Sequence, residues 1–329
     1  MSALAPVMEG FFTERLIGQL HASPHTVASY RDAFRLLLGF AQRHIAKAPS
    51  KLALEDLDAV VIGAFLDHLE VERHNSVATR NNRRAAIHSL FAYAALRHPE
   101  HAALIQRVLA IPAKRTHRQL VSFLTDDEID AVLAAPDRET WIGRRDHALL
   151  LVTIHTGLRV SELTALTCAD VELTGGAHLR CHGKGRKERI TPLTTEVAAV
   201  LRVWLAERRG APHEPVFPSR RRGALSRDAV AVLVAHHVRT AASRSPSLAT
   251  KTVTPHVLRH TCAMRLLAVG VDTSVIALWL GHEGIETTQI YLHADLAIKE
   301  QALARTAPTG AVAGRYRPSD SLLAFLENL

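Results

Sequence analysis

The chain lacks the cysteine pattern of a disulfide framework and the histidine pattern of a metal site. Its three cysteines are odd in number, far apart and without a CxxC pair, so we expect reduced thiols in or near the core. The 20 histidines include no HExxH motif, and His256 with His260 has no obvious third ligand nearby. Both absences argue against a disulfide-bonded scaffold and against a zinc site.

A membrane-spanning segment and a signal peptide are missing as well. Apolar stretches such as Ala229–Ala235 are far shorter than the roughly 18 residues that a spanning helix requires. The amino terminus has no cationic region followed by a clean apolar core. We therefore expect a cytoplasmic protein that does not enter membranes.

Positive charge is present in excess, with 40 Lys and Arg residues against 32 Asp and Glu. This balance favours an anionic partner and makes nucleic acid the leading hypothesis, although charge alone does not identify it. The length of 329 residues suffices for two domains that each bury a core of their own.

The first domain is expected at residues 1–112. Its periodicity predicts three amphipathic helices, at residues 24–44, 54–70 and 76–98. Arg80, Arg84 and His88 share one stripe of the third helix, at i, i+4 and i+8. Such a stripe is either a solvated face or, in a basic helical domain, a DNA-facing surface. The sequence leaves both interpretations open.

A linker is expected at residues 113–122, where periodicity is weak and cations such as Lys114 and Arg115 occur. It either lies along a phosphate backbone or is merely solvated. At the other end of the chain, residues 309–329 are expected to form a tail. Its last helix either packs on its own domain or docks on a neighbouring subunit.

The second domain is expected at residues 123–308. A capping box of Thr125 with Glu128 opens its first helix, and Gly157 ends a buried helix. Three short strands are predicted at 171–173, 178–182 and 188–193, with residues 183–187 as a cationic hairpin tip. The Ser/Ala-rich stretch 241–250 is expected to be a mobile loop. The predicted fold class is mainly α with a small antiparallel sheet.

Several segments of the second domain can be interpreted as groups that would make Tyr291 a reactive nucleophile. A phenol is a poor nucleophile at neutral pH, so a reactive tyrosine needs acid/base groups and cations near it. The chain offers both in four upstream segments: TGLRVSEL at 156–163, GKGRKERITPL at 183–193, HVLRH at 256–260 and LGH at 280–282.

Together with Tyr291, these segments resemble the tyrosine recombinase/integrase family. They occur in the family's order, with Tyr291 nine positions after His282, and the resemblance covers about residues 120–300. The amino-terminal half is similar more loosely, through HTVASY at 25–30 and ATRNNRRAAI at 78–87. Single residues of this kind are more often structural than catalytic, and it is their joint occurrence that favours a function.

The resemblance implies a helical core-binding domain and a catalytic domain that form a C-shaped clamp around double-stranded DNA. It implies a site-specific recombinase that cleaves and rejoins strands through a 3′-phosphotyrosyl intermediate, in integration, excision, transposition or resolution. Two protomers would bind each site and four would act together, alone or with sister recombinases. No metal and no cofactor is implied, because fixed cations stabilise the phosphate and the phosphotyrosine conserves the bond energy.

Residue roles follow from the same resemblance. Arg159 and Arg259 would bind phosphate oxygens, for which guanidinium forks are suited. The other matches are Lys184 as the acid for the leaving oxygen, His256 as the acid/base group for the tyrosine, His282 as a hydrogen-bond donor to the phosphate and Tyr291 as the nucleophile. Arg186 would contact backbone phosphate. Glu162 is expected to support Arg159 or the fold rather than to react, and His260 and Cys262 are expected to be packing residues.

Two alternatives stay open at this point. A type IB topoisomerase-like enzyme shares the chemistry but relaxes supercoils without exchanging partners. A DNA-binding accessory protein needs the basic surface but has no chemical need for all six matched residues, which weighs against it.

Overall fold

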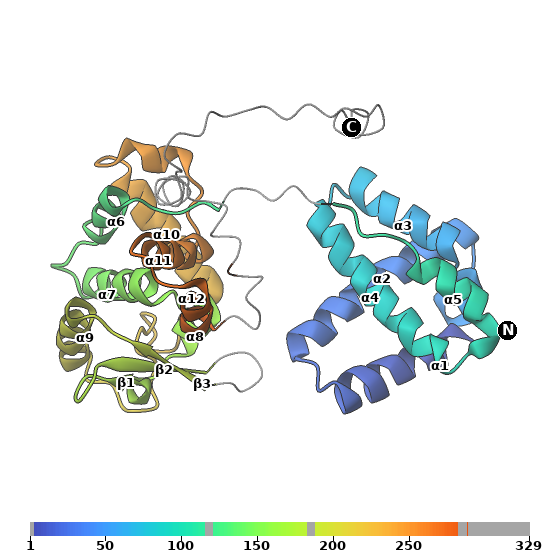
Figure 1. Ribbon diagram of the computed structural model, residues 1–329, viewed down its shortest axis with the longest axis horizontal. Coiled ribbons are helices and arrows are strands. Elements are labelled where there is room, and N and C mark those ends of the chain that lie inside the picture. Colours follow the sequence, from blue (N-terminus) through green and yellow to red (C-terminus); the bar gives the residue numbers. More distant parts are fainter. Residues whose placement is uncertain (1–2, 116–120, 183–187, 282–287, 289–329) are drawn as a thin grey trace, which may run out of the picture. The chain divides into compact units, whose positions relative to one another are not determined.

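The protein is described by a computed structural model that covers residues 3–115, 121–182, 188–281 and 288. The chain divides into two compact units, Met1–Gln119 and Leu120–Leu329 (Figure 1). Each unit has its own buried apolar core, as the chain length predicts. Among the described residues, no helix is long and apolar enough to cross a membrane.

The first unit is a bundle of helices. They are α1 (Leu4–Gly10), a π-helical segment (Phe11–Gln19), α2 (Pro24–Ile45), α3 (Ala59–Val71), α4 (Val77–Ala95) and α5 (Ala102–Leu109). The first and third predicted helices correspond to α2 and α4, which Ser23 and Ser76 cap through their hydroxyl groups. The second begins later than predicted, because the Asp58 carboxylate caps the amide groups of Val60 and Val61 (both 2.9 Å).

The polar stripe of α4 is not the open surface that its periodicity suggests. Arg80 is only 5% exposed and donates from Nη1 to the carbonyl oxygen of Pro112 (3.2 Å). Arg84 donates from Nε to the carbonyl of Ile111 (2.6 Å). His88 is half-buried, and burial together with Arg84 lowers its pKa. The expectation of a solvated or DNA-facing stripe is therefore wrong for Arg80, because this side of α4 is covered by the chain that leaves α5.

The start of the predicted linker is also fixed to α4. The side-chain amide of Asn81 makes two hydrogen bonds with the backbone of Lys114. Its Nδ2 donates to the carbonyl oxygen of Lys114 (2.8 Å), and its Oδ1 accepts from the backbone N–H of Lys114 (3.1 Å). The Lys114 ammonium is paired with Glu70 and lies 3.9 Å from Asp67. Lys114 thus belongs to the first unit, while Arg115 beside it is exposed.

The second unit is mainly α with one three-stranded antiparallel sheet in the order β1-β2-β3. Its elements are α6 (Asp126–Leu133), α7 (Trp141–Thr156), α8 (Val160–Ala165), β1 (Val171–Glu172), β2 (His178–His182), β3 (Glu188–Pro192), α9 (Thr195–Arg208), α10 (Arg227–Ala241), α11 (Pro255–Ala268) and α12 (Thr273–Leu280). Figure 1 shows the sheet at one end of this unit, beside α8 and α12. The predicted fold class and strand positions are confirmed.

Helix α7 is the central helix of the second unit and packs against α9 and α11. Most of its side chains are buried, including Leu149, Leu150 and Leu151. It ends at Gly157, whose φ of +63° is the left-handed conformation that glycine adopts without strain. This turn brings the chain directly to Arg159 at the start of α8.

The prediction of a mobile loop at 241–250 is wrong, because much of this stretch is helical and packed. Residues Pro246–Thr250 form a 3-10 helix, and Leu248 is 2% exposed. Ser247 Oγ donates to the buried Glu128 carboxylate (2.6 Å), which Lys251 also contacts (2.7 Å). Glu128 is the residue that closes the predicted capping box, and it ties this stretch to α6.

Candidate active site

Two arginines far apart in the sequence meet at the carboxy-terminal end of α12. Arg159, the N-cap residue of α8, donates from Nη2 to the carbonyl oxygen of Gly281 (2.6 Å). Arg259, in the second turn of α11, donates to the carbonyl oxygens of Leu280 (2.7 Å) and Gly157 (2.6 Å). Carbonyl groups at a helix end have no partner within the helix. The two guanidinium groups therefore complete the ends of α7 and α12.

The two arginines differ in how far they reach solvent. Arg259 is 3% exposed, whereas the side chain of Arg159 keeps 35% of its area exposed. A guanidinium group carries five N–H donors, and the two described contacts of Arg159 use only part of them. Arg159 can therefore donate to an anion without leaving its contacts.

Glu162 contacts Arg159, which is one of the two supporting roles that the sequence predicts for it. Its carboxylate is 3% exposed and accepts from the backbone amide of Arg159 (2.8 Å) and from its Nη1 (2.9 Å). Sequence reasoning missed a second cation on the same carboxylate. Arg189 in β3 donates to both Glu162 oxygens, from Nη1 (2.7 Å) and Nη2 (2.9 Å). Despite burial, these donors lower the pKa of Glu162, so the carboxylate stays ionised.

His256 lies within the electrostatic reach of both arginines. The residue is exposed, yet desolvation of its ring, followed by the charges of Arg259 and Arg159, lowers its pKa. The rings of His256 and His260 pack edge to face with their centroids 4.2 Å apart. A neutral His256 can accept a proton, which is what a general base for a phenol must do.

His260 and Cys262 pack next to residues of the candidate site, His260 on the ring of His256 and Cys262 beside Gly157. Burial, His256 and Arg259 lower the pKa of His260 to about 4. Cys262 is 2% exposed, and burial raises the pKa of its thiol to about 12. A protonated, buried thiol is unreactive. All three cysteines are free, as expected, with Cys181 also buried and Cys168 half-buried.

The remaining predicted site residues, Lys184, Arg186, His282 and Tyr291, lie outside the described residues. Two described residues of the site, Arg189 and Gly281, lie close to Lys184, Arg186 and His282 in the sequence. Residues 183–187 connect β2 to β3, the strand that carries Arg189, and His282 follows Gly281 directly. The described part of the site is thus formed by Arg159, Arg259 and His256, held by Glu162 and Arg189.

This arrangement can bind an oxyanion, and it contains no acidic cluster for a metal. In the part of the chain that the structure describes, no group of three or more His, Cys, Asp or Glu residues could hold a metal ion. Converging guanidinium groups stabilise negative charge that develops on a phosphate, and an adjacent neutral imidazole can move a proton.

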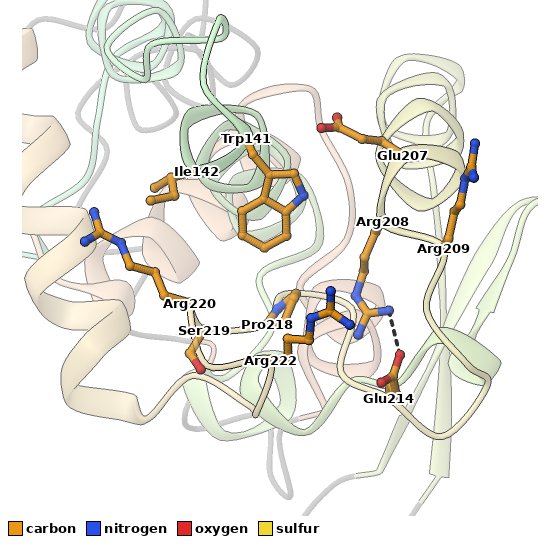
Figure 2. Close-up of a pocket in the computed structure, with 10 residues that line it drawn as sticks. All are labelled: Trp141, Ile142, Glu207, Arg208, Arg209, Glu214, Pro218, Ser219, Arg220 and Arg222. Carbon is orange, nitrogen blue, oxygen red and sulfur yellow. Dashed lines mark hydrogen bonds and ion pairs between the residues drawn. The ribbon is translucent and has the colours of Figure 1, made fainter.

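A cavity of about 710 Å³ occurs in the same unit but contains none of the site residues. Figure 2 shows Trp141, Arg208, Arg220 and Arg222 around it, with Arg208 paired to Glu214 (3.2 Å). Trp141 begins α7, and the site lies at the other end of this 16-residue helix, about 24 Å along its axis. The cavity is therefore separate from the converging charges at the end of α12.

Comparison with known proteins gives matches over both units. A family model described as the phage integrase family matches residues 122–297, and one described as the phage integrase N-terminal SAM-like domain matches residues 11–98. The y4rC protein of Sinorhizobium fredii is 57% identical over 328 residues, which cover 100% of this chain and 99% of that protein. The tyrosine recombinase XerD of Pseudomonas putida is 33% identical over 317 residues, covering 94% of this chain and all of the relative (100%).

Solved structures share the fold. The XerH site-specific recombinase bound to its difH substrate aligns with a TM-score of 0.70 and 22% identity, covering 86% of this chain and 80% of that one. A lambda integrase dimer bound to a core site aligns with a TM-score of 0.61 and 19% identity, covering 95% of this chain and 81% of the other.

Proposed function

We propose, from the premise that this chain belongs to the phage integrase family, that Arg159, Arg259 and His256 form the described part of a DNA-cleavage site whose nucleophile is Tyr291. As a member of this family the protein is a site-specific tyrosine recombinase, an enzyme that breaks and rejoins DNA. One observation carries the assignment of residues. Both arginines converge on the last two carbonyl groups before His282.

Each residue meets one need of strand cleavage. Tyr291 attacks the scissile phosphorus, the phosphotyrosine bond forms, and the bond to the 5′ oxygen breaks. Arg159 and Arg259 stabilise the charge on the non-bridging oxygens, and His282 donates a hydrogen bond to the same phosphate. His256 accepts the phenol proton, and Lys184 donates a proton to the departing 5′ oxygen. Rejoining reverses these steps, so no energy source is needed.

DNA is the partner, and the assembly on it is part of the proposal. Relatives in solved structures are bound to recombination sites, and we expect this enzyme to bind two protomers to each site and to act as a tetramer, alone or with sister recombinases. Because its substrate is DNA, we expect it to act in the cytoplasm. Contact of Arg115 and Arg186 with backbone phosphate belongs to the same proposal.

A nicked suicide substrate tests the proposed nucleophile. The recombination site is first selected from a random-sequence duplex pool by binding, and the nick is placed so that the short 5′-hydroxyl fragment diffuses away after cleavage. Wild type should accumulate a covalent protein–DNA adduct that survives denaturing electrophoresis, and Tyr291→Phe should give none.

The matched control is Tyr30→Phe, the same chemical change at a half-buried tyrosine of the first unit, which should leave adduct formation intact. An adduct with Tyr291→Phe at the wild-type level, or no adduct with wild type on the selected site, would refute the assignment.

A further inference from the structure

The environment of Glu162 raises an electrostatic problem for the proposed site. Its carboxylate is 3% exposed and contacts Arg159, whose charge the phosphate requires. In a low-dielectric surrounding, a lone carboxylate beside Arg159 would cancel most of that charge. It would also hold the guanidinium group in a neutral pair. Glu162 can position Arg159 usefully only if its own charge is balanced by another group.

Arg189 is the group that balances it. Its Nη1 and Nη2 each donate to a different oxygen of Glu162, at 2.7 and 2.9 Å, which is the bidentate geometry of a strong guanidinium–carboxylate pair. The side chain of Arg189 is 13% exposed, so little water screens the interaction. With two arginines and one carboxylate, the cluster keeps a net charge of +1.

The position of Arg189 adds a steric contact with the end of α12. A Cβ atom on Gly281 would lie 2.8 Å from Arg189 Nη1, so the guanidinium group packs directly over the Gly281 backbone. Arg189 is also the second residue of β3, where it pairs with Cys181 of β2. One side chain therefore contacts α8 and the turn before His282, and it lies at the base of the hairpin that carries Lys184.

We propose that Arg189 is a positioning residue of the cleavage reaction, which neutralises Glu162 so that Glu162 can orient Arg159 without cancelling its charge. This inference rests on the proposed function of Arg159 as a phosphate ligand. In this proposal Arg189 acts through Glu162 and Arg159.

Single-turnover cleavage of the suicide substrate tests the inference. Arg189→Gln removes the charge and should lower the cleavage rate by on the order of 10- to 100-fold, with unchanged binding of the uncut site. Arg189→Lys keeps the charge but not the bidentate geometry, and it should recover part of the rate. Arg180→Gln on the exposed face of β2 is the matched control and should cleave like wild type.

A substrate with a methylphosphonate at the scissile position separates this role from a general effect on the fold. This linkage lacks the charge that Arg159 is there to bind. If Arg189 preserves the charge of Arg159, the ratio of wild-type to Arg189→Gln rates should fall to less than about 3 on this substrate. If Arg189 serves only the fold, the ratio should be the same on both substrates, and the inference is then overturned.

The double variant Glu162→Gln/Arg189→Gln gives a second test. Once the buried carboxylate is gone, no counter-charge is needed, so adding Arg189→Gln to Glu162→Gln should cost less than about 3-fold. Additive losses would contradict the proposal. If Arg189→Gln does not fold, as judged by its thermal melt, Arg189→Lys replaces it in both comparisons. Its smaller loss of rate on the natural phosphate should then disappear on the methylphosphonate substrate and in the Glu162→Gln background, and a loss that persists in both would overturn the inference.

Failure of the inference and failure of the proposed function give different results. If wild type forms no adduct, the proposed function itself is wrong. If wild type forms the adduct and Arg189→Gln cleaves at the same rate, only the role of Arg189 is refuted.

Discussion

At the scale of single residues, the proposed site is a set of charged groups whose surroundings fix their protonation. Glu162 stays ionised although it is buried, because two arginines donate to it. The pKa values of His256 and His260 are lowered by burial and by neighbouring cations, with that of His260 at about 4. The packing that fixes the arginines next to the histidines therefore also keeps the two imidazole rings neutral.

The lowered pKa of His260 predicts a pH-dependent stability. The unfolded chain protonates this ring near pH 6.5, while the folded protein does so only near pH 4. As the pH falls from 6.5 to 4, the unfolded state thus binds more protons and stability is lost, by at most about 1.4 kcal/mol per pH unit. Above pH 6.5 this contribution is constant.

Urea unfolding at pH 7 and pH 5 measures this effect. Wild type should lose about 1–2 kcal/mol more between these pH values than His260→Gln does, since the variant has no ring to protonate. Equal losses in the two proteins would show that the pKa of His260 is not lowered.

At the scale of elements, helix ends bring together the residues of the proposed site. The left-handed glycines Gly157 and Gly281 end α7 and α12, and the carbonyl groups near these ends accept from the two arginines. A side chain at Gly157 would also meet α12, since a Cβ atom there would lie 2.6 Å from Leu280 Cδ2.

Gly157→Ala should therefore weaken both the fold and the site. The left-handed backbone strains an alanine and the added methyl group displaces Leu280, so we expect a loss of about 1–3 kcal/mol in the free energy of unfolding together with slower cleavage. Gly223→Ala is the control in the same unit, because its backbone is not left-handed and its Cβ would meet no atom within 4 Å. A thermal melt and a cleavage assay that do not distinguish the two variants would contradict this interpretation.

The helices and strands were largely predictable from the sequence. The pairing of polar side chains was predictable only in part. Local signals such as the Thr125 capping box and the glycine at the end of α7 depend on neighbouring residues, and both predictions are confirmed. The bond between Arg189 and Glu162 spans 27 residues, and no local pattern indicates it. The prediction that Arg80 is exposed was wrong for a related reason. A polar stripe has the same helical period whether solvent or another part of the chain covers it.

At the scale of the whole molecule, the excess of positive charge fits a protein that acts on DNA. The charges near the linker divide into two kinds. Arg80 is buried and bound to Pro112, whereas Arg115 is exposed. Only a charge of the second kind can approach phosphate without breaking contacts within the protein.

This difference in exposure predicts that alanine substitutions at Arg115 and Arg80 affect different properties, DNA binding in the first case and stability in the second. Arg115→Ala should lower the slope of log binding constant against log salt concentration by about 0.9, the value for one lost phosphate contact. Arg80→Ala should leave the slope unchanged and lower the thermal stability of the first unit, since it removes a buried side chain. Fluorescence anisotropy with a labelled duplex at several salt concentrations measures the slopes, and the reverse pattern would refute the division.

The contacts at the end of α12 also predict when during synthesis the proposed site can form. Arg259 reaches back 102 residues to Gly157, and Arg159 reaches forward 122 residues to Gly281. Contacts with such long sequence separations form late, because the intervening chain must first be closed into loops. A nascent chain that has emerged only as far as α11 contains both arginines but not the helix end that holds them. A ribosome-bound fragment of the enzyme is therefore expected to bind DNA before it is able to cut it.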